Sequence, residues 1–416
     1  MGRPKFVLGR IFLTVILLLA GIWVVYASWP QRTVRYHSYL YSDQEGRRLR
    51  FYPQAQYAYG MRAWLQQNPE QAARYFRRAV SENVLFFDAW LRLAEAEAVM
   101  GNEEKAQDIL TFSAMKTESV LKWKWPQMLL ARELGMDGYF FGNAVDLLSG
   151  RVLEQDTLQL LHTHFEGEAA AVIAVLEPAH LERYLDWLMR WGMADASRVV
   201  WQAMTRVGQP PRETALRLAH FLLDHRQVVA SAEIWREYTG LVGLTNPGFE
   251  TAITGQGFDW RHLSDPDGRW ELKRVDDDAA EGHYALKLTF HGRDNVSFYH
   301  LYQIFPTHPQ NRYRLTYAWK SRALTTDQGL FVEVFGYDAQ GWYQAGPMMT
   351  ATHDWQDHSI EFTAPEACHA AVVRLRRLPS MRFDSKLKGE LWIDHLRLER
   401  LPTDLTAQPA ERKNDS

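Results

Sequence analysis

The sequence predicts a multi-domain α + β protein, in which an N-terminal transmembrane helix precedes an α-helical solenoid and a C-terminal antiparallel β-sandwich. Three observations support this fold class. A run without any charged residue covers residues 11–29. Apolar residues recur at helical spacing over residues 54–243, and after Asn246 they alternate as in half-buried strands. The 416 residues are enough for two or three domains, each with its own core.

Composition excludes several classes of protein. The formal net charge of −3 provides no basic surface, so we expect no nucleic-acid partner. Cys368 is the single cysteine, which excludes an internal disulfide and a cysteine-based zinc cluster. The chain has 16 Trp, 18 Tyr and 20 Phe, which is more than a plain helical scaffold needs.

Residues 1–30 determine the expected compartment. The charge-free run at 11–29 follows three basic residues and is long enough to cross a lipid bilayer as one helix with a cytoplasmic N-terminus. The segment Val-Tyr-Ala at 25–27 would also suit a signal-peptide cleavage site, and this alternative stays open. In either case most of the chain is extracytoplasmic. Residues 31–53 form a linker to the helical region.

Residues 54–243 contain a repeated helical pattern. Gly60 and Ala94 lie 34 residues apart, and the same spacing separates two alanines twelve residues further on. Small residues are needed where the two helices of a hairpin cross closely. The segment Asn-Pro-Glu-Gln-Ala at 68–72 predicts a helix start, with Asn68 as the N-cap and proline in the first helical position.

This pattern resembles the tetratricopeptide repeat, whose period is about 34 residues. Matching segments at 184–201 and 218–235 have the same spacing, whereas residues 123–177 are degenerate. We expect four to six helical hairpins. The resemblance implies an extended groove that binds a partner protein, and a generic helical solenoid is the alternative.

Residues 244–401 carry strand signals separated by turn residues. Eight or nine short antiparallel strands without a helix between them are typical of a β-sandwich. The tail at 402–416 is polar and is expected to be disordered. The clearest alternating segments are residues 285–290, 313–319, 330–335, 358–362, 370–375 and 391–398.

Five short motifs follow one another along this β region. They are Asn-Pro-Gly-Phe-Glu at 246–250, Glu-Gly-His-Tyr-Ala-Leu at 281–286, Tyr-Arg-Leu at 313–315, Trp355 with Phe362, and Trp-Ile-Asp at 392–394. In this order they resemble the galactose-binding-like jelly rolls of carbohydrate-binding modules, particularly those appended to xylanases and glucanases.

The resemblance implies a sugar-binding surface. Flat aromatic side chains stack against pyranose rings, and a few polar groups fix the orientation of the sugar. Trp342 and Tyr343 are the strongest pair, because they follow Asp-Ala-Gln-Gly in one loop. About half of the candidate aromatics are expected to pack in the core instead. The candidates are Trp342, Tyr343, Tyr299, Tyr302, Gln303 and Trp260.

The same resemblance implies a structural calcium ion that ties the first strand to the last. Glu250 and Asp394 occupy the positions that would supply its side-chain oxygens, and loop carbonyls near Gly282 would complete the ligand set. The alternative is that both carboxylates bind backbone amides or cap strand ends. No other cofactor is required.

Motifs for catalysis are missing from the sequence. It has no G-x-S-x-G elbow, phosphate loop or H-E-x-x-H motif, so we expect no enzyme. We expect a single-pass inner-membrane protein with most of the chain in the periplasm, acting as a scaffold in envelope or exopolysaccharide synthesis or export. Its partners would be a protein at the repeats, a polysaccharide at the β module and the bilayer at residues 11–29. The alternative is a structural assembly factor whose β module binds protein and no sugar.

Overall fold

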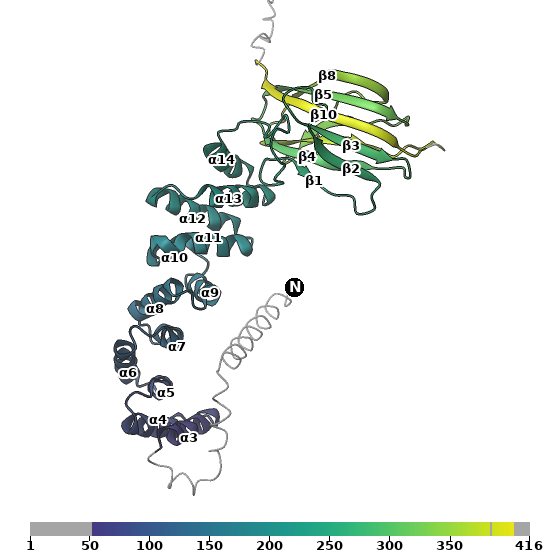
Figure 1. Ribbon diagram of the computed structural model, residues 1–416. Coiled ribbons are helices and arrows are strands. Elements are labelled where there is room, and N and C mark those ends of the chain that lie inside the picture. Colours follow the sequence, from purple (N-terminus) through teal and green to yellow (C-terminus); the bar gives the residue numbers. More distant parts are fainter. Residues whose placement is uncertain (1–51, 383–384, 403–416) are drawn as a thin grey trace, which may run out of the picture. The chain divides into compact units, whose positions relative to one another are not determined.

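The computed structural model describes residues 52–382 and 385–402, and this part of the chain forms two compact units that divide after His180. Twelve α-helices in this part precede two antiparallel sheets (Figure 1). The structure is therefore α + β with a β-sandwich. None of the helices in the described ranges is long and apolar enough to cross a membrane. The predicted anchor at 11–29 and nearly all of the linker and tail lie outside these ranges.

Consecutive helices of the first unit pack against each other. A short 3-10 helix, η3 (Pro178–His180), ends the unit. The α-helices are α3 (Pro53–Leu65), α4 (Pro69–Glu82), α5 (Phe87–Val99), α6 (Glu103–Lys116), α7 (Leu121–Glu133), α8 (Asp137–Ser149), α9 (Glu154–His164) and α10 (Ala169–Val175).

The 34-residue period is visible in these helix starts. Helices α3, α5 and α7 begin at Pro53, Phe87 and Leu121, each 34 residues after the one before, and α4, α6 and α8 follow the same rule. The predicted helix start at Asn68 is confirmed, since its side-chain oxygen accepts the amide N–H of Gln71 at 3.0 Å. The helical region is thus a helical repeat, which continues through α7 and α8 where the sequence pattern is degenerate.

Small residues mark the close helix crossings in the first repeat. A side chain at Gly60 would collide with the ring of Phe76, because a Cβ atom there would lie 2.4 Å from that ring. Ala72 and Ala94 are fully buried. The small residues read from the sequence therefore do set the distance between α3, α4 and α5.

The second unit contains four more helices and the sandwich. Its helices are α11 (Leu181–Arg190), α12 (Ala194–Val207), α13 (Arg212–Asp224) and α14 (Val228–Thr239). Ten strands follow, namely β1 (Arg261–His262), β2 (Trp270–Val275), β3 (Ala285–His291), β4 (Phe298–Pro306), β5 (Arg312–Leu324), β6 (Phe331–Gly336), β7 (Tyr343–Ala345), β8 (Ala351–Thr363), β9 (Ala370–Arg377) and β10 (Lys388–Arg400).

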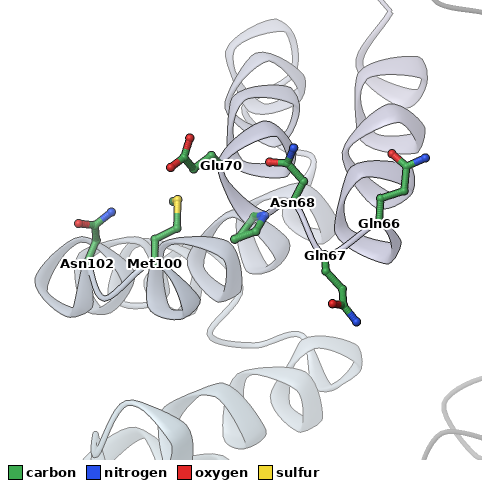
Figure 2. A pocket seen from close by; sticks show the side chains of 7 residues that line it. Gln66, Gln67, Asn68, Glu70, Met100 and Asn102 are labelled. Atoms are coloured by element: carbon green, nitrogen blue, oxygen red, sulfur yellow. The ribbon is translucent and has the colours of Figure 1, made fainter.

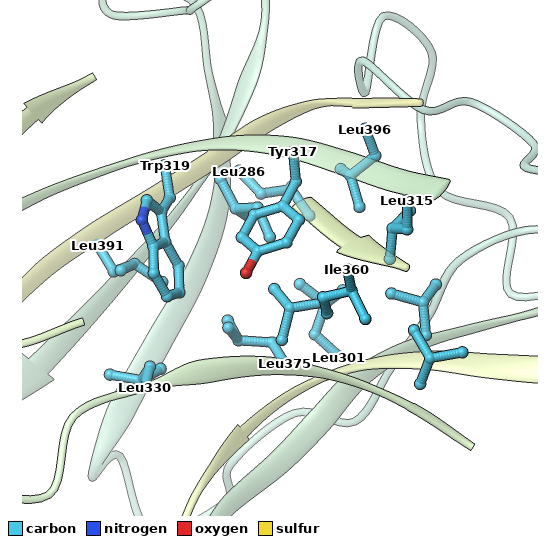
Figure 3. Packing of buried hydrophobic residues seen from close by; sticks show 14 of the residues in the cluster. Leu286, Leu301, Leu315, Tyr317, Trp319, Leu330, Ile360, Leu375, Leu391 and Leu396 are labelled. Atoms are coloured by element: carbon cyan, nitrogen blue, oxygen red, sulfur yellow. The ribbon is translucent and has the colours of Figure 1, made fainter. Parts of the chain in front are cut away.

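The strands form two five-stranded sheets with the orders β1-β4-β9-β6-β7 and β2-β3-β10-β5-β8. All six segments predicted as strands are confirmed, and most are longer than predicted. The inner faces of both sheets contribute to one hydrophobic core, which includes Leu286, Leu315 and Leu391 from one sheet and Leu301 and Leu375 from the other (Figure 3). Eight of the ten strands, all except β1 and β7, thus contribute to this core from one face and turn the other face away from it.

Candidate functional site

Strand β9 shows which side chains leave the core on the first sheet. Ala371, Val373 and Leu375 belong to the core cluster. Because side chains alternate along a strand, Arg374 and Arg376 lie on the outer face, and both are half-buried. This outer face is the part of the sandwich on which predicted site residues gather.

Two tyrosines of strand β4, which neighbours β9, lie on this face. Tyr302 is half-buried and is the register partner of Arg374. Tyr299 is 44% exposed, and its ring centroid lies 5.5 Å from the guanidinium carbon of Arg376. Each of these two tyrosines on β4 therefore lies beside an arginine on the neighbouring strand β9.

A third tyrosine reaches the same face from the edge strand β7. Tyr343 is 52% exposed and pairs in register with Phe335 of β6. The ring of Phe335 lies 4.5 Å from the guanidinium carbon of Arg374, which places both on the outer side. We call this surface, around Tyr299, Tyr302 and Tyr343, the tyrosine face.

One ion pair lies in the middle of the tyrosine face. Arg374 Nε donates to Glu333 Oε1 at 2.5 Å, and the Glu333 side chain is only 5% exposed. Burial raises the pKa of Tyr343, and the negative charge of Glu333 raises it further, whereas the charges of Arg374 and Arg376 oppose this. The four groups are therefore close enough to influence one another electrostatically.

The outer face of the second sheet is different, because ion pairs neutralise its charges. Lys287 Nζ lies 2.6 Å from Glu390 Oε1, and Arg322 binds the same carboxylate. Arg314 and Glu361 form a further pair. Trp392 is 3% exposed beneath Lys287 and Arg322, so its ring is not available for stacking.

The six predicted sugar-contacting residues separate into three groups. Tyr299, Tyr302 and Tyr343 are brought together on the tyrosine face. Trp342 is half-buried and packs against Phe362 of the core, with ring centroids 5.4 Å apart. The remaining two, Trp260 and Gln303, lie in the interior.

Trp260 and Gln303 are 1% and 0% exposed. The Trp260 indole N–H donates to the carbonyl oxygen of Asn246 at 3.2 Å, and its ring packs on Phe249. The Gln303 amide donates to the carbonyl oxygen of Thr245 at 2.7 Å. Both side chains therefore fix the segment that enters the sandwich, and neither reaches solvent.

Arg374, Arg376 and Glu333 are functional candidates that the sequence reasoning did not name. Arg374 and Glu333 lie within two segments predicted as strands, and Arg376 directly follows one of them. Their positions alternate with Val373 and Leu375 and with Val332 and Val334. The alternation within these strands is the signal that would have assigned them to the outer face.

Glu250 and Asp394, the predicted calcium ligands, bind backbone amides in this structure. Glu250 Oε1 accepts the N–H groups of His283 and Tyr284 at 2.9 and 3.1 Å. Asp394 Oδ2 accepts those of Ala280 and Glu281 at 2.9 and 3.1 Å. Both carboxylates therefore fasten chain ends of the sandwich to the loop before β3.

The pKa shifts of the two carboxyls reflect these surroundings. Hydrogen bonds from the His283 and Tyr284 amides lower the pKa of Glu250. Burial raises the pKa of Asp394, against the lowering effect of its amide donors. Calcium needs six to eight oxygen ligands, and the described ranges contain no group of three or more His, Cys, Asp or Glu side chains placed to hold a metal. The amide donors are thus the alternative to calcium that the sequence left open, and calcium itself stays a prediction.

Helix α13 contacts the sandwich near one end of β6. The Tyr337 hydroxyl donates to the carbonyl oxygen of Leu223 at 2.8 Å, and the guanidinium carbon of Arg226 lies 4.1 Å from the Tyr337 ring centroid. Arg261 of β1 forms an ion pair with Asp224 at 3.2 Å. The last helices are therefore fixed to the outer face of the first sheet next to Tyr302, whose register partner is Arg261.

A polar hollow of about 590 Å³ lies between the turn that joins α3 to α4 and the turn that joins α5 to α6 (Figure 2). Among the seven residues that line it, Glu70 is the single charged one, so hydrogen bonding is the chemistry it offers. The lining consists of Gln66, Gln67, Asn68, Pro69, Glu70, Met100 and Asn102.

No protein-family model matches the chain, and a search of curated proteins finds no match. Several solved structures similar to it are carbohydrate-binding modules, and the similarity concerns the C-terminal β region. One is a family 61 module in complex with β-1,4-galactotriose, with 19% identity over 38% of this chain and 97% of that chain and a TM-score of 0.27. A family 16 module shows 21% identity over 38% and 98%, with a TM-score of 0.26. The xylan-binding CBM22-1 domain from Paenibacillus barcinonensis shows 16% identity over 38% and 92%, with a TM-score of 0.25.

Proposed function

We propose that this chain is a non-catalytic glycan-binding scaffold, in which the sandwich binds a polysaccharide through the tyrosine face. The observation that carries the proposal is the placement of Tyr299, Tyr302 and Tyr343 around the Arg374–Glu333 ion pair on one sheet face. The opposite sheet face offers no comparable surface, because its charges are paired and Trp392 is covered.

The chemistry of the tyrosine face suits a sugar chain. Tyrosine rings present flat apolar faces to the C–H groups of a pyranose, and their hydroxyls accept or donate hydrogen bonds. Arg374 is held in place by Glu333 and is only partly exposed, so binding a sugar costs little further side-chain ordering. An extended face four strands wide suits a polymer better than a small molecule.

The helical region supplies the scaffold part of the proposal. The helix starts at 34-residue intervals support a tetratricopeptide-like array, whose exposed surface would bind a partner protein. Residues 11–29 would anchor the chain in the inner membrane with the sandwich in the periplasm, in envelope or exopolysaccharide synthesis or export. Alkaline extraction of membranes tests the anchor, since an anchored chain stays in the pellet and a cleaved one is released.

The contact between α13 and the sandwich favours a second candidate function. Tyr337 and Arg261, both half-buried, bind Leu223 and Asp224 of that helix, so the sandwich already serves as a packing partner for helices. In an assembly factor whose β module binds protein only, this contact would be the main role of the module. The tyrosine face would then be covered by a protein partner.

Native gel electrophoresis of the full chain through gels that contain soluble polysaccharides separates the two functions. A glycan-binding scaffold is retarded by at least one polysaccharide and releases no reducing ends from it. An assembly factor migrates equally in every gel. Release of reducing ends would contradict the non-catalytic proposal and identify a glycosidase activity.

A further inference from the structure

The tyrosine face carries two arginines on β9, and the Glu333 carboxylate forms an ion pair with only one of them. Arg374 is neutralised by Glu333. Arg376 lies two positions further along β9. It forms no ion pair with any residue in the described ranges 52–382 and 385–402. The next arginine along the strand, Arg377, is fully buried and donates to backbone carbonyl oxygens, including that of Gln328 at 2.9 Å. Arg376 is therefore the unpaired guanidinium of this face.

The neighbours of Arg376 are aromatic. The Tyr299 ring lies 5.5 Å from its guanidinium carbon, and the His300 ring stacks on Tyr299 with centroids 4.3 Å apart. The charge of Arg376 also lowers the pKa of Tyr343, against the raising effect of burial. Burial lowers the pKa of His300, and the charge of Arg376 lowers it further. A guanidinium held beside the exposed Tyr299 would meet a sugar that stacks on that ring.

We infer that the polysaccharide bound by the tyrosine face is acidic, and that Arg376 binds the carboxylate of a uronic acid residue while Tyr299 stacks on its ring. This inference rests on the proposed glycan-binding function. A guanidinium matches a carboxylate with two parallel N–H···O hydrogen bonds, which makes the pairing both strong and geometrically selective. A neutral glycan would leave the charge of Arg376 without a counterpart in the complex.

The test compares two forms of one polymer with the full chain. Polygalacturonate and its fully methyl-esterified form share a backbone and differ in charge. Native affinity gels should show at least tenfold tighter binding of the acidic form, consistent with one charge-assisted pair. The variant R376Q should lose about that factor for the acidic form and keep its affinity for the ester.

The matched control is R314Q, which removes the same charge from the opposite sheet, where Arg314 pairs with Glu361. It should bind both polymers as the unmodified chain does. Equal affinity for acid and ester, or an R376Q variant that still prefers the acid, would overturn the acidic-glycan inference and leave glycan binding intact. Retardation by dextran sulfate but not by polygalacturonate would overturn the uronic acid assignment and show that Arg376 binds a sulfate group instead. Absence of binding to every polysaccharide would refute the proposed function itself.

Discussion

Arg374 and Glu333 face each other in register across β9 and β6, and the Arg374 Nε atom donates to the buried Glu333 carboxylate at 2.5 Å. A charge as buried as that of Glu333 needs its partner, because an isolated carboxylate in the protein interior is strongly unfavourable. The pair therefore has a structural role in the sheet as well as a place in the proposed binding face.

Removal of Arg374 should destabilise the sandwich. The variant R374M leaves the Glu333 charge unpaired, and we expect the free energy of unfolding to fall by about 3 kcal/mol. Urea denaturation of the second unit measures this. The matched control is R376M, on the same strand and face, which leaves no buried partner and should change stability by less than about 0.5 kcal/mol. Equal losses in the two variants would contradict the assigned role of Glu333.

The contact between α13 and the sandwich should weaken in mild acid. His220 Nδ1 accepts the Gly257 amide N–H at 3.0 Å, which requires the neutral ring. Burial lowers the pKa of His220, with Asp224 raising it and Arg261 lowering it. Because the folded-state pKa is below the unfolded one, this stability is complete above about pH 6.5 and is lost as the pH falls below it.

Hydrogen exchange of the peptide around Gly257 at pH 7.5 and pH 5.5 measures this effect. After correction for intrinsic exchange, protection should fall at the lower pH in the unmodified chain. It should fall less in H220Q, where an uncharged amide oxygen replaces the ring nitrogen as acceptor. The same loss of protection in both proteins would show that His220 is not the responsible group.

Metal chelation tests the interpretation of Glu250 and Asp394. The calcium prediction requires the melting temperature of the chain to fall when chelator is added, whereas carboxylates held by backbone N–H groups alone would leave it unchanged. The variant D394A should lower the free energy of unfolding by about 3 kcal/mol, because it leaves the amides of Ala280, Glu281 and His395 without an acceptor. A drop in melting temperature on adding chelator would show that a metal ion stabilises the chain, as the calcium prediction requires.

The helical repeat was predictable in part, because small residues identify only its first copies. Gly60 and Ala94 mark the crossings in α3 and α5, but the position 34 residues later is Met128, which is fully buried. Ala72 and Ala106 likewise give way to Phe140. A larger residue at the same buried position is accommodated by different packing of α7 and α8, and a search for small residues does not detect it.

The candidate site was predictable only where exposure followed from sequence position. Tyr299 and Tyr343 lie on the outer face as expected. The polarity of Gln303 favours exposure, but its position in β4, between Leu301 and Phe305, points it inward. Trp260 lies in an irregular segment without alternation, and its burial against Phe249 depends on long-range packing that a single sequence does not encode locally.

Each exposed tyrosine should contribute separately to glycan binding. Alanine substitution of Tyr299 or Tyr343 removes one stacking ring, and we expect affinity to fall by about 2- to 10-fold for each. The exposed Tyr52 of the helical unit, at 60% exposure, provides the control variant Y52A. A loss for Y52A equal to that of the other two would indicate non-specific adhesion of tyrosines to the polymer.

The most direct test of the central claim is the affinity of the full chain and its Y299A/Y343A variant for the polysaccharide that retards it most, measured by isothermal titration calorimetry. Both rings are exposed and outside the core cluster, so the variant should fold as the unmodified chain does. We expect the affinity of the variant to be at least tenfold lower while its melting temperature is unchanged. Unchanged affinity in a folded variant would show that the tyrosine face is not where the glycan binds.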